Sequence, residues 1–290
     1  MPDGWQWDPT LFQGSAAYYE RGRLPYAPRF AERLAEELAL DGSGRLLDVG
    51  CGPGTATLAL APYFVAVVGV DPDPDMLVEA GRRARRLDVG NARWVAARAE
   101  ELPAGLGEFR AVMFAQSFHW TDRDEVAAVV RGMLPPGGAF LHMSDRKGPP
   151  TEPAGLPHPA PPSGPVAALV RSYLGEVRRA GRGVLVDGTP GGEEHVLARA
   201  GFEGFRRLIV PAGAVVERSA DDVVANVFSR SDSAPHLFGD RLGAFERDLR
   251  LLLRETSPGG VFAERVPDTE IKIWRRPVAA RRRRGRRPSS

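Results

Sequence analysis

A cluster of glycines follows a short apolar segment that contains one aspartate. Residues 46–60 read LLDVGCGPGTATLAL, in which Gly50, Gly52 and Gly54 alternate with other residues. A strand, a glycine-rich turn and a helix in this order bring backbone amides close to a ligand at the helix N-terminus. A P-loop is excluded, because no Gly-Lys-Ser/Thr follows to supply a lysine for the β and γ phosphates. The pattern predicts a cofactor site of a kind that several folds share.

Two aspartates near this turn discriminate between cofactors. Asp71 ends the next apolar segment about twenty residues on, where an acid that binds ribose hydroxyls is expected. Asp48, at the mouth of the loop, would repel a pyrophosphate and attract an ammonium group. A ligand with ribose hydroxyls and a cationic end, such as S-adenosylmethionine, is therefore favoured over a dinucleotide. The structural alternatives are a strand-end carboxylate bonded to local amides for Asp48 and a helix N-cap for Asp71.

The elements that must position these residues follow from the hydrophobic pattern. From Arg45 to about Met143, strand-like segments alternate with helical ones, which predicts a parallel sheet with right-handed crossovers. Upstream, Phe30, Leu34 and Leu38 mark the apolar face of an amphipathic helix. Downstream of a segment rich in proline and glycine, we expect helices around 166–180 and 193–200, a strand at FRRLIVP, helices at ADDVVANVFSRSDS and LGAFERDLRLLLRET, and a last strand at EIKIWRRP.

Several motifs, in their order and spacing, resemble the class I S-adenosylmethionine-dependent methyltransferases, specifically the small-molecule branch. The motifs are LLDVGCGPGT, VVGVDPDPDMLVEA, AEELP, QSFHWTD and LPPGGAFLHM. YYERGRLPYAP upstream and FSRSDS and LLLRE downstream are similar to accessory segments of that branch, so the likeness extends to about Pro277. The resemblance implies a seven-stranded sheet whose last strand runs antiparallel to the others, with EIKIWRRP pairing with FRRLIVP.

We therefore expect an α/β fold, a Rossmann-like doubly wound seven-stranded sheet with an antiparallel last strand, an N-terminal helical cap and a C-terminal insertion. The expected organisation is an N-terminal cap segment over 1–40, an S-adenosylmethionine-binding core over 41–147, lid or insertion helices with the last two strands of the same domain over 148–278, and a disordered basic tail over 279–290.

The same resemblance implies roles for individual residues around the cofactor. Gly50, Gly52 and Gly54 let the backbone approach it, Asp48 orients its methionyl end, Asp71 accepts hydrogen bonds from both ribose hydroxyls, Met76 packs near the adenine, Ala99 and Glu100 lie beside the adenine edge, and Gln116 and Ser117 lie beside the sulfonium. Met76 is equally well explained as a core methionine. The chain departs from the family at Arg98 and Arg110, where related sequences often have an aspartate or serine and an aspartate, respectively.

Catalysis of methyl transfer needs few side chains, because the reaction is an in-line displacement that depends on alignment and exclusion of water. A general base is required only if the acceptor loses a proton. His119, just past the fourth strand, is the best-placed candidate, since its ordinary pKa is near neutrality; the alternative is a wall or hydrogen-bonding role. Trp120 is expected to pack against cofactor or substrate, or within the core.

Two further segments are candidates for the roof of the site. The segment with Tyr18 and Arg23 could fold over the cofactor, with Arg23 available to the methionyl carboxylate; an exposed amphipathic leader is the alternative. Ser229 and Ser231 lie in the insertion between the last two strands, a region that resembles the substrate-facing cover of related enzymes. Serines that cap an ordinary helix end explain them equally well.

Composition restricts the class of protein further. The single cysteine, Cys51, permits no intramolecular disulfide, no apolar stretch is long enough to span a bilayer, and no secretion signal is recognised, so we expect a cytoplasmic protein. The remaining histidines (His142, His158, His195 and His236) have no ligand spacing, and we expect no metal site. Net charge is +2, and the arginine-rich tail is the main basic feature.

The sequence therefore predicts a methyltransferase that uses S-adenosylmethionine and acts on a small organic acceptor. A role in specialised metabolism is a further expectation that rests only on the resemblance to this branch of the family. A nucleic-acid methyltransferase is the first rival, but QSFHW lacks the Asn/Asp-Pro-Pro-aromatic element that holds a flipped base, and no recognition module is visible. The second rival is a protein that binds the cofactor without methyl transfer. A nicotinamide-dependent dehydrogenase is disfavoured by Asp48. The sequence does not indicate the oligomeric state.

Overall fold

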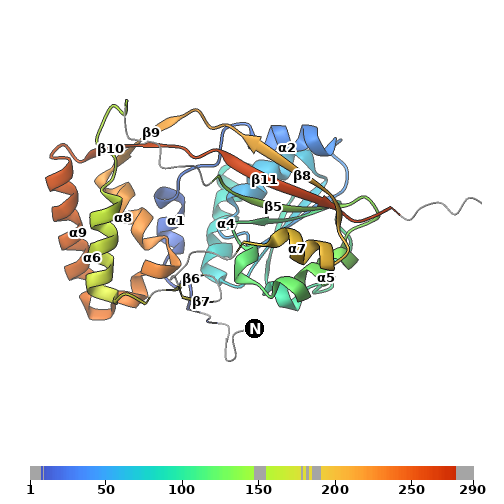
Figure 1. Ribbon diagram of the computed structural model, residues 1–290, viewed down its shortest axis with the longest axis horizontal. Helices are drawn as coiled ribbons and strands as arrows, with labels where there is room; N and C mark the ends of the chain where they lie inside the picture. The colour runs from blue at the N-terminus through green and yellow to red at the C-terminus, as the bar shows by residue number, and fades with distance from the viewer. Residues whose placement is uncertain are drawn as a thin grey trace, which may run out of the picture.

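The computed structural model describes residues 8, 10–146, 155–177, 179–180, 183–184 and 191–278. Figure 1 shows two lobes joined by long strands: a twisted sheet flanked by helices, and a smaller lobe made mainly of helices. The expected basic tail over 279–290 and the start of the expected insertion lie outside the described residues. Within the described residues, no helix combines the length and the apolar character needed to cross a bilayer.

The sheet has seven strands in the order β3-β2-β1-β4-β5-β11-β8. β1 pairs in parallel with β2 and β4, and β11 is antiparallel to both neighbours, β5 and β8. This confirms the predicted doubly wound sheet with its antiparallel last strand. The strands are β1 (Arg45–Val49), β2 (Ala66–Asp71), β3 (Ala92–Ala96), β4 (Ala111–Ala115), β5 (Ala139–Asp145), β8 (Glu203–Val210) and β11 (Thr269–Arg275).

Helices cover both faces of the sheet, because alternate strand residues are apolar on each face. Leu47, Val112 and Phe140 belong to one buried cluster with α5 and α7, whereas Leu46 and Met113 belong to another with α2 and α3. The helices are α2 (Phe30–Leu38), α3 (Thr55–Leu60), α4 (Pro74–Arg86), α5 (Arg123–Met133) and α7 (Glu193–Arg199), with short 3-10 turns η1 (Ala61–Tyr63), η2 (Ala99–Glu101) and η3 (Phe118–Trp120). The amphipathic helix predicted from Phe30 is therefore α2.

The second lobe has its own apolar cluster, built around phenylalanines such as Phe228 and Phe245. Its elements are α6 (Ser163–Leu174), β9 (Val215–Ser219), α8 (Ala220–Phe228), η4 (Ser231–Ser233), η5 (Pro235–Arg241), α9 (Leu242–Thr256) and β10 (Val261–Arg265). β9 and β10 form a two-stranded antiparallel ladder that the sequence analysis did not identify. The helix expected over 166–180 ends earlier, because Gly175 has φ +84°. β6 (Arg179–Ala180) and β7 (Gly183–Val184) form a short hairpin.

The N-terminal helix α1 (Ala16–Gly22) packs against α8 of the second lobe. A Cβ atom added at Gly22 would lie 2.4 Å from the carbonyl oxygen of Ala225, so only glycine permits this close approach. The carbonyl of Gly22 also accepts hydrogen bonds from Arg218 Nη2 (2.8 Å) and Asn226 Nδ2 (2.9 Å). The N-terminal helix is thereby held to α8 and to the end of β9.

Candidate functional site

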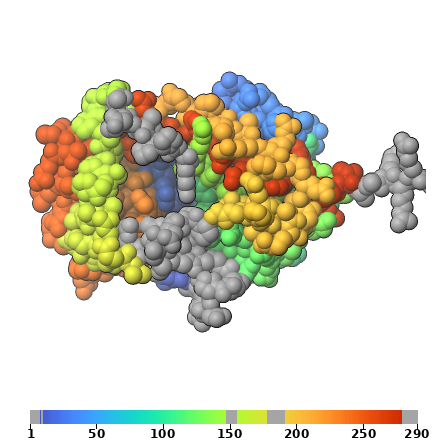
Figure 2. Space-filling view, viewed as in Figure 1, coloured from blue at the N-terminus to red at the C-terminus, as the bar shows by residue number. Residues whose placement is uncertain are grey.

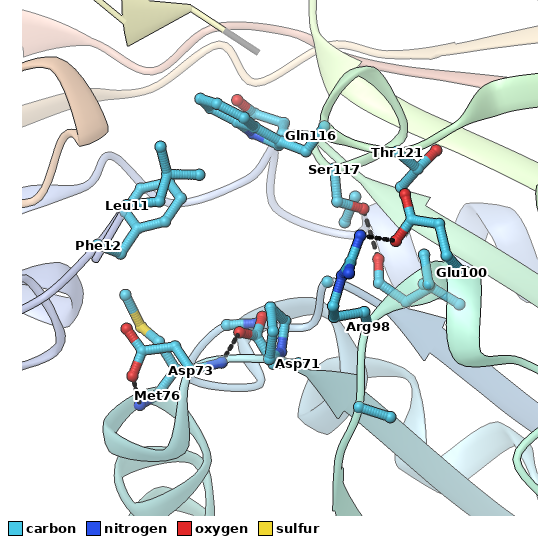
Figure 3. Close-up of a pocket in the computed structure, with 18 of the residues that line it drawn as sticks. Leu11, Phe12, Asp71, Asp73, Met76, Arg98, Glu100, Gln116, Ser117 and Thr121 are labelled. Atoms are coloured by element: carbon cyan, nitrogen blue, oxygen red, sulfur yellow. Dashed lines mark hydrogen bonds and ion pairs between the residues drawn. The ribbon is translucent and has the colours of Figure 1, made fainter. Parts of the chain in front are cut away.

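A cleft opens at the carboxyl ends of β1, β2 and β4, the edge at which doubly wound sheets bind ligands (Figure 3). The space within it, including the part open to solvent, is about 860 Å³. Most of the predicted cofactor residues line it, together with one predicted substrate residue: Gly50, Gly52, Asp71, Met76, Ala99, Glu100, Gln116 and Trp120. The fold therefore brings together residues that are far apart in the sequence.

The three glycines of the loop have different structural roles. All three have positive φ values, from +53° to +75°. A Cβ atom at Gly50 would lie 2.5 Å from Ser117 Cβ, so this position is glycine because the segment that follows β4 approaches closely. A Cβ at Gly52 would meet nothing within 4 Å, which leaves its backbone open to the cleft. Gly54 does not line the cleft; it packs against Trp94 and N-caps α3.

Asp71 forms the floor of the cleft and is held by two backbone amides. Gly52 N donates to its Oδ2 (2.8 Å), and Asp73 N donates to its Oδ1 (3.0 Å). Burial raises the pKa of Asp71 to about 6, against the lowering effect of these two hydrogen bonds. The N-cap of α4 is Asp73, whose Oδ1 accepts from Asp75 N (2.9 Å), so Asp71 is not needed as the cap.

Apolar and charged side chains face each other across this cleft. Leu11 and Phe12 lie opposite Arg98 and Glu100 (Figure 3). Arg98 Nη2 lies 3.5 Å from Glu100 Oε2, and Glu100 Oε1 accepts from the amide of Asp122 (2.8 Å). Arg98, which departs from the family pattern, is therefore paired with Glu100, the acid predicted to lie beside the adenine edge.

The end of β4 joins this cleft to a second one. Gln116 lines both and has φ +56°, a left-handed conformation that residues other than glycine rarely adopt. Its Nε2 donates to Asp145 Oδ2 at the end of β5 (3.1 Å). Trp120 lines only the first cleft, and its ring contacts Phe12 edge-on at 5.8 Å.

The second cleft, of about 750 Å³ with its solvent-open part, lies over the glycine loop and beneath the N-terminal segment. Its lining residues are Tyr19, Arg23, Leu24, Tyr26, Gly50, Cys51, Pro53, Thr55, Ala56, Ala115, Gln116, Asp145 and Asn226. The Arg23 guanidinium lies 5.0 Å from the centre of the Tyr19 ring, and its Nη2 donates to Ser229 O (2.9 Å). The N-terminal segment therefore covers the site. That Arg23 binds the methionyl carboxylate of the cofactor stays a prediction.

Asp48 is completely buried and lines neither cleft, in contrast to the expectation of a carboxylate at the loop mouth. Thr57 Oγ1 donates to its Oδ2 (2.5 Å), and its Oδ1 has no hydrogen-bond partner among the described residues. Burial raises the pKa of Asp48 to about 7. The side chain connects β1 to α3, which places it below the loop.

Four further predicted residues do not line the two clefts. His119 is half-buried, with its ring centroid 5.1 Å from that of Trp120. Tyr18 points into the core of the second lobe and contacts Phe228 at 5.2 Å. Ser229 is fully buried and donates to Asn226 O, while Ser231 begins η4. Their catalytic and substrate roles stay predictions.

The sequence analysis missed several residues that line the clefts. Leu11 and Phe12 had a signal, since an apolar pair stands just before the glycine and serine that precede α1. Asp145 and Asn226 had none, because each reaches the site only through the long-range packing of β5 and α8. Among the described residues, no group of three or more His, Cys, Asp or Glu side chains is arranged to hold a metal ion.

Residues 46–138 match the model of a methyltransferase domain. An uncharacterized methyltransferase of Mycobacterium tuberculosis is 37% identical over 132 residues, 45% of this chain and 51% of the relative. An uncharacterized methyltransferase of Synechocystis is 35% identical over 115 residues, 39% of this chain and 52% of the relative. The matched region spans about half the length of these relatives.

Solved structures share the fold over most of the chain. A candidate methyltransferase from Bacillus halodurans has a TM-score of 0.50 and 18% identity, covering 87% of this chain and all of the other. The cyclase SpnF has the same TM-score at 20% identity, covering 93% of each chain. At these identities the likeness concerns the fold alone.

Proposed function

Residues 46–138 form a methyltransferase domain of the class I, S-adenosylmethionine-dependent type, and from this premise we propose that the whole protein transfers a methyl group from that cofactor to a small organic acceptor. The observation that carries the proposal is the pair of adjoining clefts at the carboxyl edge of the sheet, which share Gly50, Gln116 and Tyr19. Their common wall is the natural position for the reacting sulfur.

The residues of the clefts fit this cofactor. Asp71 has an ordered carboxylate, whose remaining lone pairs suit ribose hydroxyls, and the cleft beyond it is lined by the apolar Met76, Leu11 and Phe12. The backbone of Gly52 is open to the ligand. Arg23 lines the second cleft, and the charge and geometry of its guanidinium suit a ligand carboxylate.

When bound, the cofactor supplies a methyl group on a sulfonium that is already activated for displacement. The protein must align the acceptor with it and exclude water. Leu11, Phe12 and Trp120 provide apolar cover on the side of the first cleft, and Tyr19 covers the junction with the second. An acceptor that loses a proton would need a general base, and His119 is the candidate that the sequence suggests for this role.

A small acceptor is supported by a third cavity, in the second lobe. Its volume is about 650 Å³ with its solvent-open part. Apolar side chains of α6 and α8 line it, together with polar and charged ones: Pro161, Ser163, Val166, Ala167, Val170, Val223, Asn226, Val227, Arg230, Asp232, Ser233 and Glu264. Asn226 lines both this cavity and the second cleft, so the two adjoin across one side chain. Figure 2 shows a hollow between the lobes beside α6, with part of α1 visible at its bottom. A pocket of this size suits a small molecule better than a duplex.

Calorimetric titration with S-adenosylhomocysteine, with NAD in a parallel cell, tests the cofactor part of the proposal. Binding of the first and none of the second is expected; the reverse would refute it. Transfer of labelled methyl groups to a panel of small oxygen, nitrogen and carbon acceptors tests the reaction. Binding without transfer to any acceptor would favour a protein that holds the cofactor without using it, whereas labelling of RNA or DNA that is lost on deletion of 279–290 would favour a nucleic-acid substrate.

A further inference from the structure

One arginine outside the two clefts contacts both the glycine loop and the N-terminal helix above it. Arg83 lies in α4 and lines neither cleft. Its guanidinium donates hydrogen bonds to the second half of the loop and pairs with Glu20 of α1. We propose that Arg83 is a positioning residue for cofactor binding, which fixes the second half of the loop and, through Glu20, holds α1 over the site. The proposal rests on the proposed function and adds a residue that acts on the ligand without touching it.

Arg83 holds the part of the loop that leads into α3. Its Nη1 donates to Pro53 O (3.2 Å) and to Thr55 Oγ1 (2.8 Å), and both of these residues line the second cleft. The first half of the loop is anchored differently, through two backbone amides that donate to Val70 O of β2. A guanidinium stays charged, and hydrogen bonds from a charged donor are stronger than those between neutral groups. Arg83 therefore fixes the backbone of this wall of the cleft from the side away from the ligand.

Glu20 connects the same arginine to the cover of the site. Its Oε1 lies 3.5 Å from Arg83 Nε and accepts a hydrogen bond from Arg86 Nη2 (2.5 Å), three residues further along α4. Glu20 follows Tyr19, which lines both clefts. Figure 1 shows α1 beside α4, in agreement with the contact between the two helices. The loop and the helix that covers it are thus joined through one guanidinium.

The two ends of this connection differ in exposure. The side chain of Arg83 is only 11% exposed, whereas that of Glu20 is 43% exposed. Burial lowers the pKa of Arg83, and the charge of Glu20 acts to raise it, so the acid stabilises the buried cation. The bonds to the loop are therefore shielded from solvent, while the pair with Glu20 is open to screening by salt. Salt should weaken the hold on α1 and leave the hold on the loop in place.

The test measures how fast S-adenosylhomocysteine leaves the protein. Radiolabelled ligand is bound and then chased with excess unlabelled ligand, at about 0.05 M and about 0.5 M NaCl. Glu20→Gln should release the ligand about two- to fivefold faster than wild type at low salt, and the difference should shrink at high salt, because salt screens the wild-type pair. Arg83→Gln, which also loses the bonds to the loop, should weaken binding roughly tenfold or more. Arg82→Gln, which removes an exposed pair with Glu79 (3.0 Å) within α4, is the matched control and should follow wild type at both salt concentrations.

A second measurement needs no ligand and separates the proposal from the proposed function. Hydrogen exchange of the α1 amides in the ligand-free chain should be faster in Glu20→Gln than in wild type and unchanged in Arg82→Gln, because the pair holds α1 to α4. Failure of wild type to bind S-adenosylhomocysteine would refute the proposed function, whatever the exchange shows. Binding by wild type with unchanged exchange in Glu20→Gln would overturn the link to α1 alone.

The remaining outcomes each decide one part of the proposal. Release from Glu20→Gln at the wild-type rate, or a difference that does not depend on salt, would overturn the link to the cover. Wild-type affinity in Arg83→Gln would overturn the hold on the loop. Glu20→Gln keeps the buried arginine, so its unfolding midpoint should stay within about a degree of wild type. Faster release together with a midpoint lowered by several degrees would also overturn the proposal, because general loosening of the chain would then explain the effect.

Discussion

Asp48 should make the ligand-free protein less stable as the pH rises towards neutrality. Its pKa is raised from 3.8 to about 7, chiefly by burial. Between these two values the folded chain retains a proton that the unfolded chain has lost, so the free energy of unfolding falls with increasing pH. A difference of about three pKa units, at about 1.4 kcal/mol per unit, corresponds to about 4 kcal/mol in total.

Asp48→Asn removes this ionisation while keeping the size and shape of the side chain. The amide can still accept the hydrogen bond from Thr57. Relative to wild type, the variant should therefore gain about 4 kcal/mol between pH 4 and pH 8. Asp71, whose pKa is raised to about 6, contributes a similar but smaller fall of about 3 kcal/mol, which remains in both proteins.

Urea unfolding at pH 4.5, 6 and 8, followed by circular dichroism, measures the difference directly. Because the comparison is between variant and wild type at each pH, the contributions of carboxylates that do not interact with Asp48 cancel. Asp71 is the exception, since its charge is one of the causes that raise the pKa of Asp48. Asp124→Asn, which removes an exposed carboxylate paired with Arg199, is the control and should follow wild type at every pH. A difference between Asp48→Asn and wild type that stays constant with pH would show that Asp48 ionises normally in the folded chain, and the argument from burial would be wrong.

Three further outcomes are expected. Asp71→Asn should weaken S-adenosylhomocysteine and 5′-methylthioadenosine alike, by about tenfold or more, since both carry the ribose; calorimetry would contradict this if either affinity were retained. His119→Ala should slow transfer to a protonated acceptor roughly hundredfold if the imidazole is a base, and a loss below about threefold in steady-state turnover would reduce it to a wall residue. Gly22→Ala should lower the thermal midpoint by several degrees, because its Cβ would meet Ala225 O at 2.4 Å; an unchanged midpoint would show that α1 can shift freely.

Much of the fold was predictable because local patterns and tertiary structure agree in the core. The apolar strand before Gly50, the acid at the end of β2 and the capped start of α4 each have a local signature. β9 and β10 have none, since VVERS and VFAER are short and do not alternate between apolar and polar residues, and they become strands only by pairing with each other.

The residues of the candidate site that belong to the glycine loop were predictable from the sequence. The burial of individual side chains and the contacts between distant segments were not. Asp48 precedes the glycines as expected, but it is buried because it lies on the sheet face that α3 covers, where Thr57 Oγ1 donates a hydrogen bond to it. Asp145 follows an ordinary buried strand, and only the path of the N-terminal segment across the sheet brings Arg23 near it. No spacing rule relates residues more than a hundred positions apart.

The contact at Gly22 has a consequence for the order of events in the site. Because α1 lies directly on the backbone of α8, any displacement of α8 is passed on to the segment that carries Tyr19 and Arg23. α8 also forms a wall of the cavity in the second lobe, through Val223 and Asn226. A molecule that binds in that cavity and displaces α8 would therefore also move the N-terminal segment that covers the adjoining second cleft. Occupancy of one compartment would set how long the contents of the other are retained.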